Sequence, residues 1–357
     1  MLKEHSPKPW YARTELDPDR FVNFGTPGSQ EWWYFDVISE DGRDALVIVF
    51  YAALPFDPEY GVQTLRHLRN PSRNPAPNPL DHCAIGFQWY REGKTIAYAL
   101  NGFQADDFRY EANPFSVKVD QNVLSRDESG YHLTIQTPTV DGRGTIRASI
   151  RFTPNLATVP YTSELGTTES RHEWTLVAAD CQVNGQVTID GPDAGKLDFV
   201  GRGYHDHNAG SQEIRLAIRE WAWGRVHAGR ETFVYYKSTS HHGTSAQIVL
   251  RLKDGALHSD HEYLLDNADR QKTRFGLRYF RGFSFAKVDS KAQANPDDMV
   301  TMNEPVDQGP FYLRWVTMFT IKGHAYPGIA EWLETKNLHR FWFNWMIGYR
   351  LKRPKRV

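Results

Sequence analysis

The chain of 357 residues has few cysteines, almost no net charge and no long apolar run. Its two cysteines, Cys83 and Cys181, are too few for a disulfide framework, and they are interpreted either as a reduced, packed pair or as one bridge. The 42 Lys and Arg residues are balanced by 43 Asp and Glu, so no overall positive field is present to hold a nucleic-acid backbone. The longest apolar run, 45–56, is about half the length that a membrane-spanning helix needs. Residues 1–10 are polar and contain no apolar signal region. We therefore expect a soluble, cytoplasmic protein with no nucleic-acid partner.

Aromatic residues are abundant, with 11 Trp, 17 Tyr and 20 Phe against only 5 Met. Such a composition indicates either a densely packed aromatic core or a large pocket lined by aromatic side chains. The chain length is typical of two domains of ordinary size, each able to bury a core.

Strand patterns are frequent along the chain and helix patterns are sparse. About thirteen short runs are rich in β-branched and aromatic residues, and Asp-Gly or Asn-Gly pairs at 41–42, 141–142, 184–185 and 254–255 predict hairpins between some of them. This number of strands exceeds the number in one small barrel. It predicts an all-β protein with two domains, 20–210 and 211–357. The Asn-, Pro- and Arg-rich stretch 66–80 predicts a long loop. Only 327–347 is expected to be helical.

The C-terminal end combines aromatic and basic residues. From Lys336 onward the chain has seven Lys and Arg residues, no acid, and several Trp and Phe residues. One interpretation is a helix that packs against a barrel and carries a solvated basic tail. The alternative is an interfacial segment that makes peripheral contact with a membrane, because Trp and Phe beside cations suit the headgroup boundary.

The densest group of ionisable residues is Gly-Tyr-His-Asp-His-Asn at 203–208. In an extended strand, Tyr204, Asp206 and Asn208 share one face, and His205 and His207 share the other. Three interpretations stay open: a buried polar network, a proton-transfer site built on Asp and His, and a metal site that lacks an evident third ligand.

A second group, Glu-Trp-Trp-Tyr-Phe-Asp at 31–36, places Trp32, Tyr34 and Asp36 on one strand face and Trp33 on the other. The stretch 220–225 repeats this acid-and-tryptophan pattern and suggests two related halves. The chain has no phosphate-binding glycine loop, no Gly-x-Ser-x-Gly motif and no Cys-x-x-Cys pair. Nucleotide cofactors, serine hydrolysis and thiol redox chemistry therefore lose support.

Four blocks in order resemble the carotenoid 1,2-hydratase family: Glu-Trp-Trp-Tyr-Phe-Asp at 31–36, Leu-Asp-His-Cys-Ala at 80–84, Tyr-His-Asp-His-Asn at 204–208, and the C-terminal segment 343–354. The resemblance covers most of the chain, and its wider superfamily includes AttH-type proteins and fungal Diels–Alderases. It implies two lipocalin-like antiparallel β-barrel or sandwich domains with a short C-terminal helix. It also implies a hydrophobic small-molecule substrate, and an enzyme that adds water to a terminal isoprenoid double bond without a cofactor or metal.

The resemblance also assigns expected roles to individual residues. Asp206 or a protonated His207 would deliver a proton to the alkene, and Tyr235 matches a family position. The substrate pocket is expected to include Trp33, Tyr34, Asp36, His82, Trp174, Tyr204, His205, Asn208, Trp223 and Lys237. Trp33 and Trp223 would shelter the cation that forms.

Two positions depart from the family pattern. Ala209 stands where a Trp usually follows the Asn of the motif, and Lys237 stands where the acid of a Tyr-x-Asp pair is expected. The departures leave three hypotheses: an enzyme that protonates an isoprenoid or polyene to give hydration or cyclisation, a pericyclase that folds a polyene, and a lipid- or pigment-binding protein without chemistry.

Overall fold

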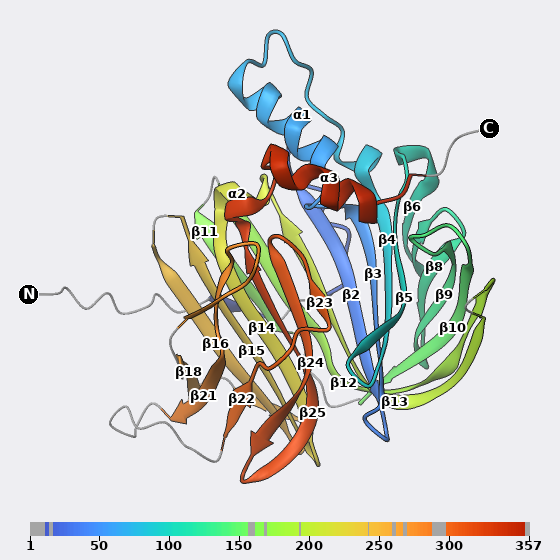
Figure 1. The fold of residues 1–357 in the computed structure, drawn as a ribbon, viewed down its shortest axis with the longest axis vertical. Coiled ribbons are helices and arrows are strands. Elements are labelled where there is room, and N and C mark those ends of the chain that lie inside the picture. The colour runs from blue at the N-terminus through green and yellow to red at the C-terminus, as the bar shows by residue number, and fades with distance from the viewer. Residues whose placement is uncertain are drawn as a thin grey trace, which may run out of the picture.

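The computed structural model describes residues 11–13, 17–155, 161–167, 170–192, 194–241, 243–258, 262–266, 270–287 and 298–353. Within these ranges the protein consists of two large, curled antiparallel sheets, packed face to face along a common seam (Figure 1). The prediction of an all-β fold with a short C-terminal helix is therefore confirmed.

The N-terminal sheet has 13 strands in the described part of the chain, and they hydrogen-bond in the order β5-β4-β3-β2-β13-β12-β10-β9-β8-β7-β6, with β11 on β12 and β1 on β11. The strands are β1 (Tyr11–Arg13), β2 (Gln30–Ser39), β3 (Asp44–Ala53), β4 (Ala84–Arg91), β5 (Lys94–Gly102), β6 (Phe108–Ala112), β7 (Phe115–Val119), β8 (Asn122–Asp127), β9 (Gly130–Pro138), β10 (Thr145–Pro154), β11 (Tyr161–Thr167), β12 (Ser170–Asp190) and β13 (Gly195–Gly210).

The C-terminal sheet follows the order β17-β16-β15-β14-β25-β24-β22-β21-β18, with β23 on β24, and β19 and β20 form a separate pair. Its strands are β14 (Ile218–Ala228), β15 (Glu231–Ser240), β16 (Ser245–Lys253), β17 (Ala256–His258), β18 (Glu262–Asp266), β21 (Gly282–Lys287), β22 (Met299–Thr301), β23 (Asp307–Gln308), β24 (Tyr312–Ile321) and β25 (His324–Glu334); the pair is β19 (Arg270–Lys272) and β20 (Arg278–Phe280). The chain passes from one sheet to the other between 210 and 218. The division into domains 20–210 and 211–357 stays a prediction.

Helices lie at one end of the molecule, at the top of Figure 1. They are α1 (Pro58–Arg69), α2 (Ile214–Ala217), α3 (Phe341–Arg350) and the 3-10 turns η1 (Pro79–His82), η2 (Ala105–Asp107) and η3 (Thr335–Asn337). The prediction of a loop at 66–80 is wrong for residues 66–69, because α1 continues to Arg69. The helix is initiated by Asp57, whose side chain accepts a hydrogen bond from the Glu59 amide, and by Pro58 in the first turn.

Two other expectations from the sequence are corrected. The expected helix at 327–347 begins only at Phe341, because 327–334 is the end of β25 and pairs with both β14 and β24. The expected hairpin at Asn184-Gly185 is absent, since both residues lie inside the 21-residue strand β12. The Asp-Gly pairs at 41–42, 141–142 and 254–255 do separate paired strands. Cys83 and Cys181 are both buried and free.

Alternation along the strands produces three large cores in the described part of the chain, besides a small cluster of Leu54, Ala84 and Leu351. Trp33 and Phe35 of β2 point into the core enclosed by the N-terminal sheet, whereas their neighbours Trp32 and Tyr34 point into the seam between the sheets. A third core lies within the C-terminal sheet. Polar contacts also cross the seam: buried Arg225 of β14 is ion-paired with buried Asp36 of β2.

Candidate functional site

Asp206 of β13 lies at the centre of a buried polar group in the seam. Its Oδ2 accepts hydrogen bonds from the Trp174 indole Nε1 at 2.9 Å and from the Tyr204 hydroxyl at 2.8 Å. Its Oδ1 accepts one from the Asn208 amide at 2.8 Å. The alternation of β13 places Tyr204, Asp206 and Asn208 on the same face, as the sequence pattern predicts.

Burial changes the protonation of this carboxyl group. Removal from water raises the pKa of Asp206 to about 7, against the hydrogen bonds from Trp174 and Tyr204, which lower it. The group is therefore present in both its acid and its carboxylate form near neutral pH. A carboxyl group held in this condition inside an apolar pocket is suited to general acid catalysis.

A cavity with an empty volume of about 340 Å³ opens beside Asp206, and aromatic side chains from both sheets form its walls. Its lining residues are Trp32, Tyr34, Trp174, Asp206, Asn208, Trp221, Trp223, Tyr236 and Glu331. The rings of Trp223 and Tyr34 meet edge to face, with centroids 5.4 Å apart. The cavity therefore offers several π-faces close to one acidic group.

Glu331 of β25 brings a second carboxyl group to the same cavity from the opposite sheet. Its Oε1 accepts hydrogen bonds from Arg314 Nε at 2.9 Å and from the Tyr34 hydroxyl at 3.1 Å. Arg314 also donates to the Gln88 side chain and the Tyr90 hydroxyl in the N-terminal sheet. The carboxyl groups of Asp206 and Glu331 are thus held by separate hydrogen-bond sets on the two sides of the seam.

A larger cavity, with an empty volume of about 970 Å³, adjoins the first, because Trp32, Tyr34, Trp221 and Glu331 line both. It extends toward α3, whose Met346, Ile347 and Arg350 form part of its wall. The two cavities, both lined mostly by apolar side chains, are therefore neighbours, one beside α3 and the other beside Asp206.

Three predicted site residues lie on the opposite face of the N-terminal sheet. His205 Nε2 is 2.8 Å from Asp19 Oδ1, and His207 Nε2 is 2.9 Å from Glu31 Oε1. Trp33 stacks on His207 in the same core, with ring centroids 4.9 Å apart. All three are buried outside the two cavities, so their expected roles in proton delivery and substrate binding stay predictions that this placement does not favour.

Four further predicted residues also lie outside the cavities. The Tyr235 ring is buried among Phe283, Phe285 and Phe319 in the core of the C-terminal sheet. Lys237 lies on the same face of β15, with its ammonium group 5.3 Å from the centre of the Phe280 ring. Asp36 is ion-paired with Arg225, and His82 hydrogen-bonds Asp57 at 2.6 Å beside Arg353.

The structure thus brings five of the predicted residues to the cavity beside Asp206, with Tyr204 directly behind the carboxyl group. The five are Tyr34, Trp174, Asp206, Asn208 and Trp223. The prediction from sequence missed Trp32, Trp221, Tyr236 and Glu331. Alternation alone indicates the first two, because Trp32 shares a strand face with Tyr34, and Trp221 shares one with Trp223. Glu331 carries no such pattern, since only the tertiary fold brings β25 opposite β13.

Two other kinds of site are absent from the described residues. No group of three His, Cys, Asp or Glu side chains is arranged to hold a metal ion within those ranges. Among the helices described, none has both the length and the hydropathy to cross a membrane.

Comparisons with known proteins give one family model and relatives that carry two different activity names. A family model described as "Carotenoid hydratase CrtC" matches residues 68–357. The chain is 31% identical over 316 residues to a "Hydroxyneurosporene dehydrogenase" of Chlorobaculum tepidum, which covers 83% of this chain and 78% of that protein. It is 28% identical over 239 residues to an "Acyclic carotenoid 1,2-hydratase" of Thiocapsa roseopersicina, which covers 66% of this chain and 54% of that protein.

Among solved structures, the fold is similar to that of a putative AttH protein from Nitrosomonas europaea. The TM-score is 0.57 at 15% sequence identity, and the alignment covers 89% of this chain and 96% of that one. At this identity the likeness shows the shared architecture of two half-barrel sheets.

Proposed function

The chain belongs to the CrtC carotenoid hydratase family, and from this premise we propose that it adds water to a terminal isoprenoid double bond of an acyclic carotenoid without a cofactor. The observation that carries the proposal is the buried carboxyl group of Asp206, whose pKa is raised to about 7, in a cavity walled by aromatic rings. The reaction class matches the name of the Thiocapsa roseopersicina relative.

Asp206 in its acid form is the proton donor. Adding its proton to the less substituted alkene carbon leaves the positive charge on the tertiary carbon. Trp174, Tyr204 and Asn208 all donate hydrogen bonds to Asp206. They therefore stabilise the carboxylate that remains after the proton has left.

The tertiary cation is stabilised by the aromatic walls. Trp32, Trp221, Trp223 and Tyr236 line the cavity around Asp206. A cation near an aromatic face gains about 2 kcal/mol when water is excluded. The next step is the attack of a water molecule on this cation.

Glu331 is the group suited to hold that water. Its carboxylate is ion-paired with Arg314 and reaches the cavity from the sheet opposite Asp206. A water molecule hydrogen-bonded to Glu331 or Tyr34 would attack the tertiary carbon and lose one proton to Glu331. One proton leaves Asp206 and one arrives at Glu331 in each turnover, and exchange with solvent restores both groups.

The proposal is tested with an acyclic carotenoid in water enriched in heavy oxygen. The wild-type protein is expected to form a tertiary alcohol carrying the label, and Asp206→Asn to lower turnover by a factor of about 10² to 10⁴ while still binding the carotenoid. Asp44→Asn is the control, because Asp44 is also buried and accepts a tryptophan N–H, from Trp89, but is ion-paired with Arg91 and lies outside both cavities. Full activity in Asp206→Asn would refute the mechanism.

Other outcomes identify the competing functions. A wild-type product that carries no heavy oxygen but is cyclised would favour a cyclase or pericyclase. Carotenoid recovered unchanged after long incubation with the wild-type protein would favour a binding protein.

The role of Glu331 is tested separately by hydrogen exchange in heavy water. Glu331→Gln keeps a side chain that can bond Arg314 and Tyr34, but it removes the base. We expect the alcohol to decrease by roughly 10²-fold, while deuterium still enters recovered carotenoid because the cation forms and reverts. Alcohol formation at the wild-type rate would contradict this role.

A further inference from the structure

Helix α3 presents a row of large aromatic side chains to solvent. Phe341, Trp342, Trp345 and Tyr349 are 80%, 77%, 69% and 65% exposed. Exposed aromatic residues gathered on a single helix mark an interaction surface. Ile347, on the other side of the helix, is buried and lines the large cavity.

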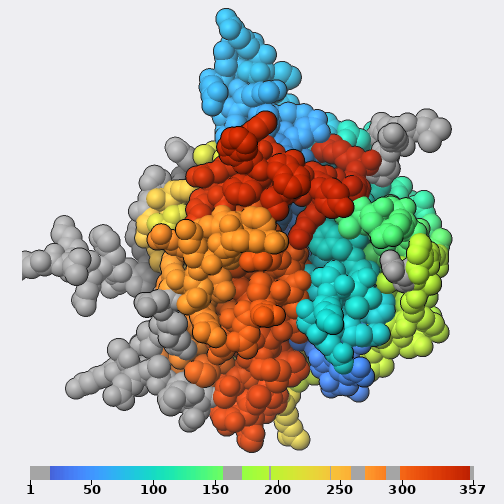
Figure 2. All heavy atoms as spheres, in the orientation of Figure 1, coloured from blue at the N-terminus to red at the C-terminus, as the bar shows by residue number. Residues whose placement is uncertain are grey.

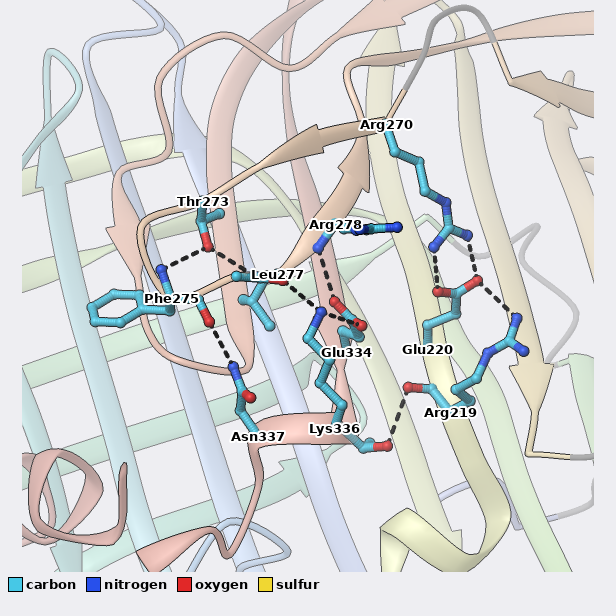
Figure 3. A network of polar contacts seen from close by, with 12 residues as sticks. Arg219, Glu220, Arg270, Thr273, Phe275, Leu277, Arg278, Glu334, Lys336 and Asn337 are labelled. Atoms are coloured by element: carbon cyan, nitrogen blue, oxygen red, sulfur yellow. Dashed lines mark hydrogen bonds and ion pairs between the residues drawn. The ribbon is translucent and has the colours of Figure 1, made fainter. Parts of the chain in front are cut away.

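The base of α3 is held in place by a network of polar contacts just before the helix begins (Figure 3). Asn337 donates to the Phe275 carbonyl at 2.9 Å and to the Pro310 carbonyl at 2.8 Å. Lys336 donates to the Gly276 carbonyl, and Thr335 donates to the carbonyl of Ile218 in β14. These contacts fix the start of α3 to the C-terminal half, and just after the helix the Lys352 amide donates to the Leu100 carbonyl of β5 in the N-terminal sheet. Figure 2 shows the segment lying over both sheets.

The surface around these aromatic residues is basic. Stretches 60–80 and 335–353 contain no Asp or Glu, and Arg66, Arg69, Arg73 and Arg340 are exposed. Helix α1, which carries the exposed Leu68, contacts α3 at this end of the molecule (Figure 1). Neighbouring acids neutralise part of this charge: Asp57 is paired with Arg353, Asp307 with Arg350 and Glu334 with Lys336, while exposed Glu59 lies 3.5 Å from Arg353. The exposed arginines of α1 and the loop after it, together with Arg340, are the cations that remain for a partner.

We propose that this end of the molecule, with α3 and α1 as its contact surface, docks on an anionic lipid bilayer. Aromatic rings beside arginines suit the boundary between headgroups and acyl chains, and the arginines attract anionic headgroups. A second copy of this chain is disfavoured as the occupant, because a two-fold interface would bring the same arginines against one another.

Docking in this way places the large cavity against the bilayer. Met346, Ile347 and Arg350 of α3 form part of the cavity wall, directly behind the exposed aromatic row. An apolar substrate would then enter the large cavity from the bilayer, and movement of the shared wall residues, such as Tyr34 and Trp221, would bring it to Asp206. This last step rests on the proposed function, whereas docking itself does not.

The docking is tested by flotation of the full-length protein with vesicles that contain no carotenoid. We expect binding to phosphatidylcholine vesicles containing roughly 30% phosphatidylglycerol, weakened by added salt. The double variant Trp342→Ser, Trp345→Ser is expected to bind about tenfold or more weakly. Met318→Ser is the matched control, because Met318 is 50% exposed on β24, away from α3, and should bind as the wild type does.

Three results would overturn the proposal. The first is wild-type protein that does not float with the anionic vesicles, and the second is a double variant that floats equally well. The third is a wild-type dimer in sedimentation that the double variant abolishes, which would assign the surface to a second copy. Turnover separates this proposal from the hydratase function: the double variant should match the wild type on detergent-solubilised carotenoid and lose activity only on carotenoid in vesicles.

Discussion

Asp206 shows how one side chain acquires an unusual protonation state from its neighbours. The residue is buried in an aromatic cavity, yet each of its two oxygens accepts a hydrogen bond from a fixed donor. Burial favours the neutral acid and the donors favour the carboxylate, and burial prevails. The result is an acid that can give up its proton and be restored near neutral pH.

The pH dependence of turnover follows from this state. Because the reacting form is the neutral acid and the pKa of Asp206 is raised to about 7, kcat/KM should be constant at lower pH and fall about tenfold per pH unit above that value. The measurement is a pH profile of kcat/KM on detergent-solubilised carotenoid between pH 5 and about 9. A profile that stays flat across pH 7 would contradict proton donation by Asp206, and it is the result expected of a pericyclase.

The sequence predicts correctly which side chains share a strand face, but it predicts only some of the residues that line the cavity. Alternation along 203–208 correctly places Tyr204, Asp206 and Asn208 together, and the same argument along 31–36 places Trp32 with Tyr34. Alternation cannot tell which of the two strand faces meets the other sheet. The sequence therefore predicts Trp33 in the pocket, whereas the structure places Trp32 there. That choice depends on how the two sheets pack, which no local pattern encodes.

Single elements show where local patterns mislead. Asn184-Gly185 has the typical composition of a tight hairpin, but β12 passes straight through it. Gly185 is needed there for another reason: a Cβ atom would lie 2.4 Å from the Ser149 carbonyl oxygen and 2.7 Å from the Ile150 Cα of β10. Likewise 327–334 is a strand rather than a helix, because both of its edges are paired.

This close approach predicts that Gly185→Ala destabilises the fold. The added methyl group meets backbone atoms, which cannot rotate away, so the free energy of unfolding should fall by about 1–3 kcal/mol. Gly348→Ala in α3 is the control, because its Cβ would meet nothing within 4 Å and alanine favours a helix by about 1 kcal/mol. Urea denaturation of both variants measures the difference, and a Gly185→Ala protein as stable as the wild type would show that β10 and β12 can separate.

The whole molecule works as two sheets that share one seam. Each sheet contributes one carboxyl group to the cavity, Asp206 from β13 and Glu331 from β25. Polar contacts across the seam fix the position of one sheet against the other. Among them are the hydrogen bond from Arg314 to Gln88 and the ion pair of Arg225 with Asp36. The site therefore exists only when both halves are folded and correctly apposed.

The ion pair across the seam gives the prediction that belongs to this scale. Arg225 and Asp36 are both fully buried, and burial already raises the pKa of Asp36 against the lowering effect of Arg225. Arg225→Met therefore leaves Asp36 in the seam without its partner, either charged or forced to take up a proton, and should lower the free energy of unfolding by about 3–5 kcal/mol. The double variant Arg225→Met, Asp36→Leu removes both charges and should regain most of this loss. The exposed pair of Arg147 and Asp190 is the control, because Arg147→Met should cost less than about 1 kcal/mol. Urea denaturation measures stability, and carotenoid turnover measures whether the two carboxyl groups remain apposed. If Arg225→Met were as mild as Arg147→Met, the ion pair of Arg225 with Asp36 would contribute nothing to holding the two sheets together.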